Sequence, residues 1–390
     1  MKLLCKTTDL QQALHLVSRA ISNQQALPIL GNILLHVEGK RCTCSATDLE
    51  LSIMTHFPAD VENEGAITIP AKAFLNFAQY NTDAEVLLET SEGTQLRCTS
   101  KKAKTLISGE AAAEYPTITS IKKETSFPLV ADPLLHALHS VTFAAATTTL
   151  RPVLAGVYVR SQKGKLIFVA TDSYRLSEYK LPVDSSVDVS CIIPKKVFDE
   201  LQAIVGSQKE KSSGKTKGAG DEGEKQEKKS SAAHVEVALS SQQIEITTGS
   251  TTLLSRLIDG KFPDYEQIIP KAPKTTVTIP VSELLPTIRR MHYFAKETNN
   301  NLTFHITKEG IRITTPTTQS GRDEATLGAV VSGADNKIAL SSSYLLDFLG
   351  HIPGGEVEMR ITDSQHPALF TIPGVEGFSH LIMPLRLQEE

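Results

Sequence analysis

The segment Ala170-Thr171-Asp172-Ser173-Tyr174-Arg175-Leu176 begins with the same three residues as the earlier segment Ala46-Thr47-Asp48. A shift of 124 residues aligns these two segments, and the same shift aligns Ile69-Pro70 with Ile193-Pro194 and Pro28 with Pro152. A register that persists over such a distance indicates that one unit occurs twice. Repeats have to be recognised before a fold is assigned, because each repeat is normally one structural unit.

A third copy is present but weaker. Glu236-Val237 aligns with Glu356-Val357 at a shift of 120 residues, and Leu138 aligns with Ile288 at a shift of 150 residues. Three copies account for the whole chain of 390 residues. We therefore predict three domains, at residues 1–124, 125–271 and 272–390.

The register slips within the second copy because residues 207–233 have no counterpart in the first. This segment has seven lysines, five acidic residues and no large apolar residue. Such a composition cannot bury enough apolar surface to offset the entropy of ordering. We predict a disordered insertion there.

Each copy shows the same order of elements, in which a β run leads into a helix, strands follow, and a second helix precedes further strands. The first helix of copy one is predicted at residues 8–20. In copy two, Asp132 and Pro133 open the first helix. In copy three, Ser282 opens it, and Pro286 is expected to break its first turn. Thr8 and Gln11 have capping-box spacing.

The second helices are predicted at residues 70–80, 194–205 and 341–351, and a hairpin is predicted around Lys163-Gly164. The pattern predicts an α+β fold of three repeated domains, each with two helices packed on antiparallel sheet.

The composition excludes several classes of protein. A net charge of −4 excludes a protein that holds nucleic acid by bulk positive charge, although a local basic surface remains compatible. No apolar run reaches the roughly 18 residues that a membrane span needs. The chain start is too polar for a signal peptide, and five cysteines fit a reducing compartment. We expect a cytoplasmic protein with no membrane partner.

Motifs of metal, cofactor or catalytic chemistry are weak. Gly214-Lys215-Thr216 lacks the upstream glycine of a phosphate-binding loop, and no second pair of ligands accompanies Cys42 and Cys44. We therefore expect no metal and no cofactor. Asp48 and Asp172 recur at equivalent positions, which is typical of a turn after a strand, and the alternative is a pair of catalytic acids.

Basic side chains recur on the faces of the predicted helices opposite to their apolar residues. Spacing alone favours a solvated face, and contact with nucleic acid is the alternative. The candidates for facing DNA are Arg19, Lys72, His136, His139, Lys195, Lys196, Arg289, Arg290 and Lys296.

Five motifs in order, on a threefold repeat, resemble the bacterial DNA sliding clamp, the beta subunit of DNA polymerase III. They are residues 27–32 (LPILGN), 151–156 (RPVLAG), 170–176 (ATDSYRL), 260–265 (GKFPDY) and 383–387 (MPLRL). The resemblance implies a non-catalytic processivity factor, which forms a head-to-tail homodimeric ring around double-stranded DNA.

The resemblance also implies sites and partners. The subunit contact would involve Thr105, Leu106, Ile107, Tyr293 and Phe294. A pocket would bind peptides of DNA polymerase III alpha, clamp-loader subunits and other proteins with clamp-binding peptides. Its residues would be Leu154, Thr171, Ser173, Tyr174, Arg175, Leu176, Pro263, Ile268, Pro367, Leu381, Ile382, Met383, Pro384, Leu385 and Arg386.

The chain departs from the family pattern at three places. Gln24 and Gln25 stand where the DNA-touching loop usually carries a basic residue, Gln267 replaces a common basic residue at the pocket rim, and residues 388–390 extend beyond the usual end. Two alternatives remain open: a scaffold that keeps the pocket but never encircles DNA, and a hydrolase that uses Asp48 and Asp172.

Overall fold

The structure is a computed structural model, and it describes residues 1–22, 27–91, 94–148, 150–183, 187–213 and 234–387, without the side chains of residues 208–213. The chain divides into two compact units. The first comprises residues 1–132 and 196–257, and the second comprises residues 133–195 and 258–390. Each unit is described by itself.

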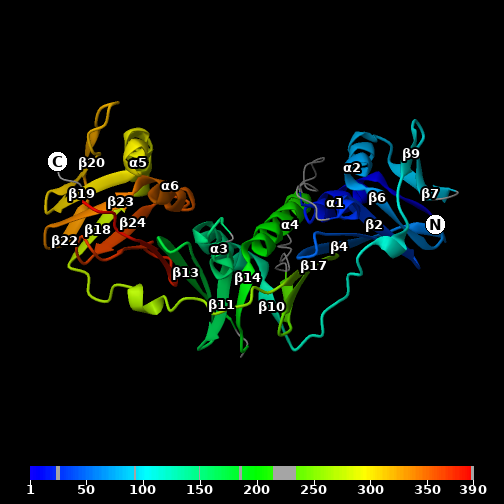
Figure 1. Ribbon diagram of the computed structural model, residues 1–390, viewed down its shortest axis with the longest axis horizontal. Coiled ribbons are helices and arrows are strands. Elements are labelled where there is room, and N and C mark those ends of the chain that lie inside the picture. Colours follow the sequence, from blue (N-terminus) through cyan, green and yellow to red (C-terminus); the bar gives the residue numbers. More distant parts are fainter. Residues whose placement is uncertain (23–26, 92–93, 149, 184–186, 214–233, 388–390) are drawn as a thin grey trace, which may run out of the picture. The chain divides into compact units, whose positions relative to one another are not determined.

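The first unit contains two sheets with helices packed on them (Figure 1). The five-stranded sheet has the order β5 (Asp60–Asn63), β1 (Lys2–Lys6), β7 (Glu85–Ser91), β8 (Gln95–Thr99), β9 (Lys104–Ser108). The eight-stranded sheet has the order β10 (Thr125–Val130), β15 (His234–Leu239), β16 (Gln243–Thr248), β17 (Thr251–Arg256), β4 (Leu51–Pro58), β3 (Arg41–Thr47), β2 (Asn32–Glu38), β6 (Gly65–Pro70).

Helices α1 (Thr7–Ser18) and α2 (Ala71–Tyr80) pack against each other and bury Leu10, Leu14 and Phe74. Helix α4 (Lys195–Ser213) belongs to the same unit apart from its first residue. The apolar residues recur at helical spacing, so each helix buries one face and exposes the other.

The second unit repeats this plan. Its nine-stranded sheet has the order β14 (Ser190–Pro194), β11 (Gly156–Gln162), β12 (Lys165–Thr171), β13 (Arg175–Pro182), β26 (Phe378–Ile382), β25 (Ala368–Thr371), β24 (Glu356–Ile361), β18 (Thr275–Pro280), β22 (Val330–Gly333). Its four-stranded sheet has the order β21 (Glu324–Leu327), β20 (Gly310–Thr314), β19 (Asn301–Thr307), β23 (Asn336–Ser341).

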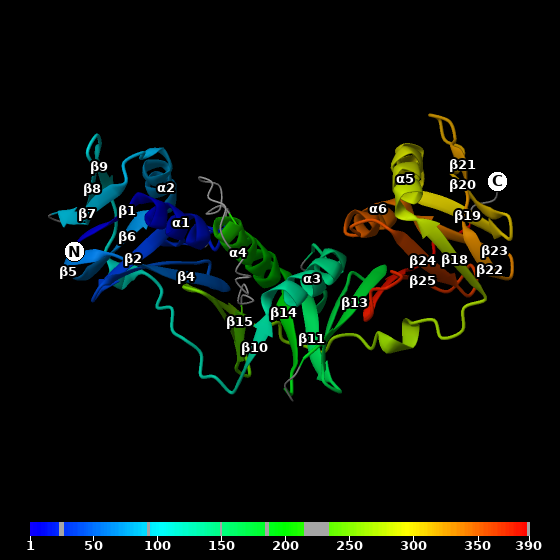
Figure 2. The same cartoon turned by 180° about the vertical axis from the view of Figure 1, so that it is seen from behind.

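Helices α5 (Val281–Ala295) and α6 (Ser342–Gly350) pack against each other and contact β18 and β26 of the nine-stranded sheet (Figure 2). Helix α3 (Ala131–Val141) lies in the second unit from Pro133 onward. Ile288, Phe304, Phe348 and Phe370 are fully or almost fully buried in a continuous apolar core.

The repeat is visible in the positions of the helices. The first helices begin at Thr7, Ala131 and Val281, and the second helices begin at Ala71, Lys195 and Ser342. The first helices start 124 and 150 residues apart, which are shifts that also align the sequence copies. Across the described residues, each copy has two helices on antiparallel sheet, which confirms the predicted fold class.

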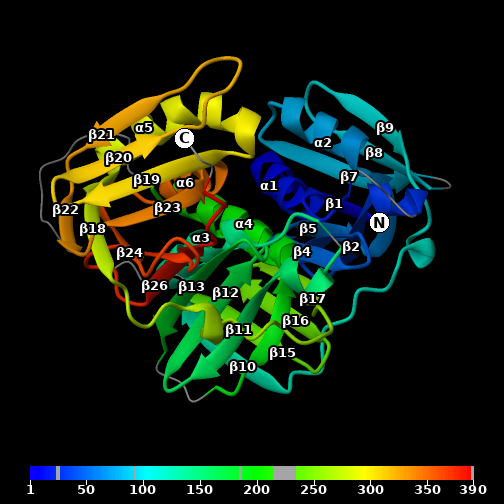
Figure 3. The ribbon, with the colours of Figure 1, turned by 60° about the vertical axis from the view of Figure 1, so that its left-hand side comes forward.

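The sheets continue from one predicted domain into the next (Figure 3). Strand β17 pairs with β4, where Leu253 lies opposite Ile53, and strand β13 pairs with β26, where Ser177 lies opposite His380. We call these pairings the first and second joints. Each joint covers two strand edges that would otherwise be exposed.

The helix N-termini differ from the prediction. Lys6 precedes α1 without a side-chain cap, and Gln11 Nε2 instead donates to the Ala78 carbonyl at 2.6 Å. Asp132 and Ser282 are second residues of their helices. The physical reason is that each helix follows a strand directly, so the last extended residue takes the capping position.

Helix α5 runs through Pro286 unbroken. The proline is the sixth residue of the helix. Because it has no N–H, the helix lacks only the hydrogen bond from residue 286 to the Ser282 carbonyl. The predicted hairpin is confirmed: β11 and β12 are joined by Lys163 and Gly164, with φ of 49° and 72°. Both positive values suit a two-residue turn that matches strand twist.

Helix α4 continues to Ser213, so the first part of the predicted insertion is helical and not disordered. The helix continues beyond Ile204 and Val205, the last buried apolar residues described in it. Residues 214–233, with the Gly214-Lys215-Thr216 motif, lie outside the described residues.

Candidate functional site

The two recurrent aspartates build the same turn. Asp172 Oδ1 accepts from the N–H groups of Tyr174 (2.9 Å) and Arg175 (3.0 Å). Asp48 Oδ1 accepts from the equivalent N–H groups two and three residues on, at 3.1 and 2.7 Å. Ser173 and Leu49 both have positive φ, at 80° and 77°. The interpretation of both aspartates as turn residues is confirmed.

The side chain of Arg175 extends from this turn and binds Asp347 of helix α6. Its side chain is buried, with Nε 3.0 Å from Asp172 Oδ2 and Nη1 2.7 Å from Asp347 Oδ2. The guanidinium lies 4.8 Å from the ring centre of Tyr344 and 5.7 Å from that of Phe143. Arg175 therefore ties β13 to α6 and is not an exposed rim residue.

A buried apolar cluster brings together part of the predicted peptide pocket. Leu154, Leu176 and Leu381 lie in one cluster with Phe262 and Leu369. Because β13 and β26 are neighbours, Leu176 lies directly opposite Leu381. The second joint brings Leu369 and Leu381 of the third copy to Leu154, Leu176 and Phe262 of the second copy.

Other predicted pocket residues surround the cluster at different depths. Tyr174 and Ile268 are 63% and 40% exposed. Ser173, Pro263 and Arg386 are exposed, Met383, Pro384 and Leu385 are half-buried, and Thr171 and Pro367 are buried. Gln267 is exposed and donates to Asp264 at 2.5 Å.

Ile382 lies elsewhere. It is fully buried in the core with Phe348 and Phe370, separate from the cluster of Leu381. Successive residues of a strand point to opposite faces, so neighbours in a strand cannot share one pocket. Ile382 therefore lies opposite Arg175 in the strand pairing, but its side chain is not part of the cluster of Leu381.

A buried polar network positions the segment that carries Ile268. Tyr265 donates from its hydroxyl to Glu178 Oε2 at 2.7 Å, and Arg160 Nη2 donates to the Tyr265 hydroxyl at 3.1 Å. Burial raises the pKa of Tyr265, and the bond to Glu178 adds to this. The sequence prediction missed Arg160 and Glu178, since no local pattern links them to residue 265.

The segment after β26 is fixed by its backbone. The Met383 N–H donates to the Tyr174 carbonyl at 2.8 Å, and the Leu385 N–H donates to the Ala339 carbonyl at 2.8 Å. Asn301 Nδ2 donates to the Arg386 carbonyl at 3.1 Å. Residues 388–390 lie outside the described residues.

Lys196, Arg19 and Arg290, which are candidate DNA-facing cations, form ion pairs within the chain. Lys196 Nζ lies 2.5 Å from Asp48 Oδ2, and Arg19 pairs with Glu200. Arg290 binds Asp323 through two contacts of 2.8 and 3.1 Å. Each pair cancels one positive charge on the helix face.

The two candidate histidines each lie against another aromatic ring. His139 lies 4.7 Å from the ring of His351, and burial lowers its pKa, with His351 contributing. The His136 ring meets the Tyr179 ring edge-on at 5.4 Å. Lys72, Arg289 and Lys296 are exposed, and Lys195 is half-buried. Gln24 and Gln25 lie outside the described residues.

The candidate subunit contact involves edge strand β9, which carries Thr105, Leu106 and Ile107, and helix α5, which carries Tyr293 and Phe294 and contacts edge strand β21. Strand β9 ends the five-stranded sheet and strand β21 ends the four-stranded sheet. On β9, Leu106 is 54% exposed, Thr105 is half-buried and Ile107 is buried. Tyr293 is 65% exposed and meets half-buried Phe294 edge-on, with ring centres 5.3 Å apart.

Within the described residues, no cluster of three or more His, Cys, Asp or Glu side chains is placed to hold a metal ion. Cys42 and Cys44 are buried strand thiols. Burial raises the pKa of Cys98 to about 12, which disfavours the reactive thiolate. None of the helices described combines the length and hydrophobicity that a membrane crossing needs.

Comparison with known proteins gives a consistent family. Models of the N-terminal, central and C-terminal domains of the DNA polymerase III beta subunit match residues 1–119, 129–213 and 266–386. The chain is 28% identical to the beta sliding clamp of Synechocystis sp., over 99% of this chain and all of that protein. It is 26% identical to that of Bacillus subtilis, with the same coverage.

Solved structures agree with the sequence relatives. The DNA polymerase sliding clamp of Bacillus subtilis superposes with a TM-score of 0.88 at 25% identity, and all of both chains is covered. The DNA polymerase III beta subunit of Pseudomonas aeruginosa gives a TM-score of 0.89 at 25% identity, over 99% of this chain and all of that one.

Proposed function

Because the chain belongs to the family of bacterial DNA polymerase III beta subunits, the beta sliding clamps, we propose that two copies close head to tail into a ring around duplex DNA. The family is non-catalytic and confers processivity on DNA polymerase III. DNA and polymerase are therefore the expected partners of the chain.

The sheet topology supports closure by a second copy. Each copy of the repeat has a fourth strand (β4, β13, β21) and a last strand (β9, β17, β26), and the two joints pair a fourth strand with the last strand of the next copy. Strands β21 and β9 remain, one at each end of the series. A contact that repeats with rotation would pair these two edges between copies and close a ring.

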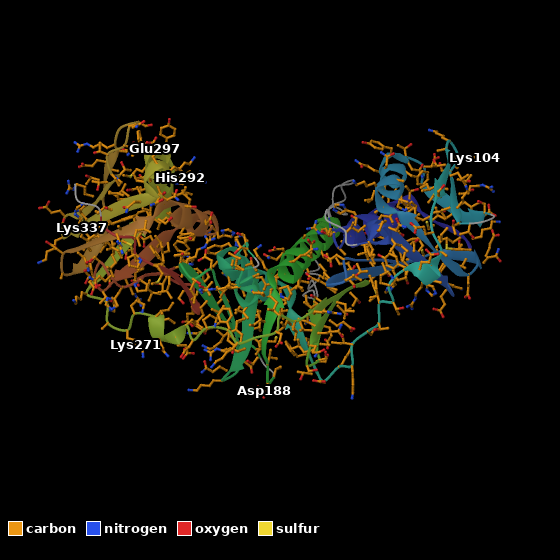
Figure 4. All side chains as sticks on the ribbon, viewed as in Figure 1. Lys104, Asp188, Lys271, His292, Glu297 and Lys337 are labelled. Carbon is orange, nitrogen blue, oxygen red and sulfur yellow. The ribbon has the colours of Figure 1, made fainter. Side chains whose placement is uncertain are left out.

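Exposed charges on the two edges offer ion pairs for this contact. Lys101, Lys102 and Lys104 are exposed in or beside β9, and Glu297 and Glu324 are exposed in or beside β21, where Arg312 and Arg322 are exposed as well (Figure 4 labels Lys104 and Glu297). Opposite charges on two surfaces steer and orient their association.

Weak contacts suffice for a protein that encloses DNA. Phosphate contacts from Lys and Arg are independent of sequence and allow sliding. Exposed Lys72, Arg289 and Lys296 supply such contacts, and the ion pairs of Arg19, Lys196 and Arg290 moderate them.

The cluster of Leu154, Leu176 and Leu381 and the exposed residues around it support a peptide site. An apolar floor with a half-buried Met383 adapts to varied apolar side chains. Peptides of the polymerase alpha subunit, of clamp-loader subunits and of other clamp-binding proteins would compete for this surface. The three predicted domains, 1–124, 125–271 and 272–390, of each of two copies would then form the six units of the ring.

A topological experiment tests enclosure. Leu106→Cys and Phe294→Cys, joined across the contact by a bis-maleimide, should keep the protein on nicked circular DNA through high salt, and linearising the DNA should release it. Leu106→Cys alone, treated identically, is the control. Equal retention on circular and linear DNA would contradict the ring. It would favour the alternative of a scaffold that keeps the pocket but never encircles DNA.

A further inference from the structure

The two joints share a contact besides their strand pairing: the end of the first helix in one copy meets the second helix of the next copy. At the first joint, Arg19, which follows α1, pairs with Glu200 on α4. At the second joint, Phe143, which follows α3, stacks on His351, which follows α6, with ring centres 4.3 Å apart and planes 19° apart.

These contacts occupy equivalent positions of the repeat. The helix starts fix the alignment of the first helices, so Arg19 corresponds to Phe143 and Phe143 corresponds to Tyr293. The second helices align by their own starts, and His351 at the end of α6 corresponds to Tyr80 at the end of α2. Tyr293 and Tyr80 thus occupy the two corresponding positions that neither joint uses.

Both tyrosines are exposed in the single chain. Tyr80 is 71% exposed and Tyr293 is 65% exposed, whereas the equivalent ring of His351 is half-buried against Phe143. Two large, exposed aromatic residues at the ends of a series of repeats are a surface that a neighbouring copy would cover.

The polar partners at this position also differ. The position of Glu200 on α4 corresponds to Asp347 on α6, and each carboxylate binds an arginine across its joint. On α2 the corresponding residue is Asn76. The third contact therefore has no carboxylate at this position and depends on aromatic packing.

We propose that Tyr293 of one protomer packs on Tyr80 of a second copy of this chain, as the counterpart of the stack between Phe143 and His351. Arg289 corresponds to His139, whose ring lies 4.7 Å from His351, so Arg289 also lies over Tyr80. A guanidinium over a tyrosine ring adds a favourable cation–π contact. This pairing rests on the proposed ring and names residues within its contact.

A double-mutant cycle tests the pairing. Tyr80→Ala, Tyr293→Ala and the double variant are made in the full chain, and the dimer dissociation constant is measured by sedimentation velocity. Each single change should weaken the dimer, and the coupling between them should be about threefold to tenfold, as expected of an aromatic pair. Val130→Ala, which truncates an exposed apolar side chain on β10, should leave the dissociation constant unchanged.

If the fold-increase of the dimer dissociation constant in the double variant equals the product of the two single fold-increases, the two tyrosines act independently. This result overturns the pairing but not the ring. A wild-type chain that stays monomeric at every concentration overturns the ring itself and the pairing with it. All variants change exposed side chains, and unchanged thermal unfolding verifies that they fold.

A designed replacement gives a second, independent readout. Tyr293→Arg with Asn76→Glu rebuilds the Arg19–Glu200 pair at the third position. Each single variant should weaken the dimer, and the combination should return the dissociation constant to within about threefold of the wild-type value. No recovery in the combination shows that residues 76 and 293 do not meet and contradicts the proposal.

Discussion

The ion pair between Arg19 and Glu200 gives a quantitative prediction for DNA binding. Glu200 is mostly buried and neutralises Arg19, which is itself about one-third exposed. Glu200→Gln keeps the shape of the side chain and removes its charge. Arg19 then has a net positive charge that a phosphate can recruit.

The magnitude follows from counterion release. One additional phosphate contact per protomer steepens the slope of log K against log salt by about 0.9, or about 1.8 for a ring of two protomers. Between about 50 and about 200 mM salt, this slope corresponds to an additional loss of affinity of about tenfold. At low salt the variant should bind a short primed duplex more tightly than the wild type.

Fluorescence anisotropy over a salt series measures this slope. Glu309→Gln, on the hairpin between β19 and β20, removes the same charge away from the helix ends and should not change the slope. A Glu200→Gln slope equal to that of the wild type refutes the placement of Arg19 near DNA. Equal steepening by both variants shows an effect of net charge alone.

Three further predictions concern stability and peptide binding. Arg175→Ala should lower the urea midpoint and cost about 2–4 kcal/mol of unfolding free energy, because it leaves Asp172 without its buried partner; an unchanged midpoint would contradict this. Met383→Asp should abolish binding of a polymerase-tail peptide in a fluorescence assay and leave dimerisation intact, and retained affinity would mean that the site lies elsewhere. Burial lowers the pKa of His380 well below its usual value, so the unfolded chain takes up a proton below about pH 6.5 and stability falls as the pH falls. His380→Gln should therefore lose less stability than the wild type between about pH 7.5 and about pH 5.5, and equal losses would show that another group is responsible.

The repeat allowed the arrangement of helices to be predicted, because an inherited unit keeps its element positions even where the sequence diverges. The helix starts at Thr7, Ala131 and Val281 follow the same shifts as the sequence copies. Local capping rules were less reliable, since they assume a loop before the helix. Here Lys6 is both the last residue of β1 and the cap of α1, so no separate capping residue exists.

The functional residues show a similar division. Leu176 and Leu381 could be placed near each other from the family motifs, and the second joint pairs them. The position of Ile382 could have been corrected from the sequence, because its neighbour Leu381 already occupies the cluster face of the same strand. The partners of the basic residues could not be inferred, since Arg19 and Glu200 are 181 residues apart and meet only at the first joint.

The acidic partners of these basic residues change how the proposed ring should be understood electrostatically. A lining made only of unpaired cations would bind DNA more tightly with every added contact and would slow sliding. Lys196 with Asp48 and Arg290 with Asp323 keep their cations near the helix surface at no net charge. A phosphate must displace a carboxylate to gain such a cation, so the contact forms and breaks with little change in free energy. Enclosure then keeps the ring on the DNA, and the paired charges keep the binding free energy nearly constant as the ring moves along the duplex.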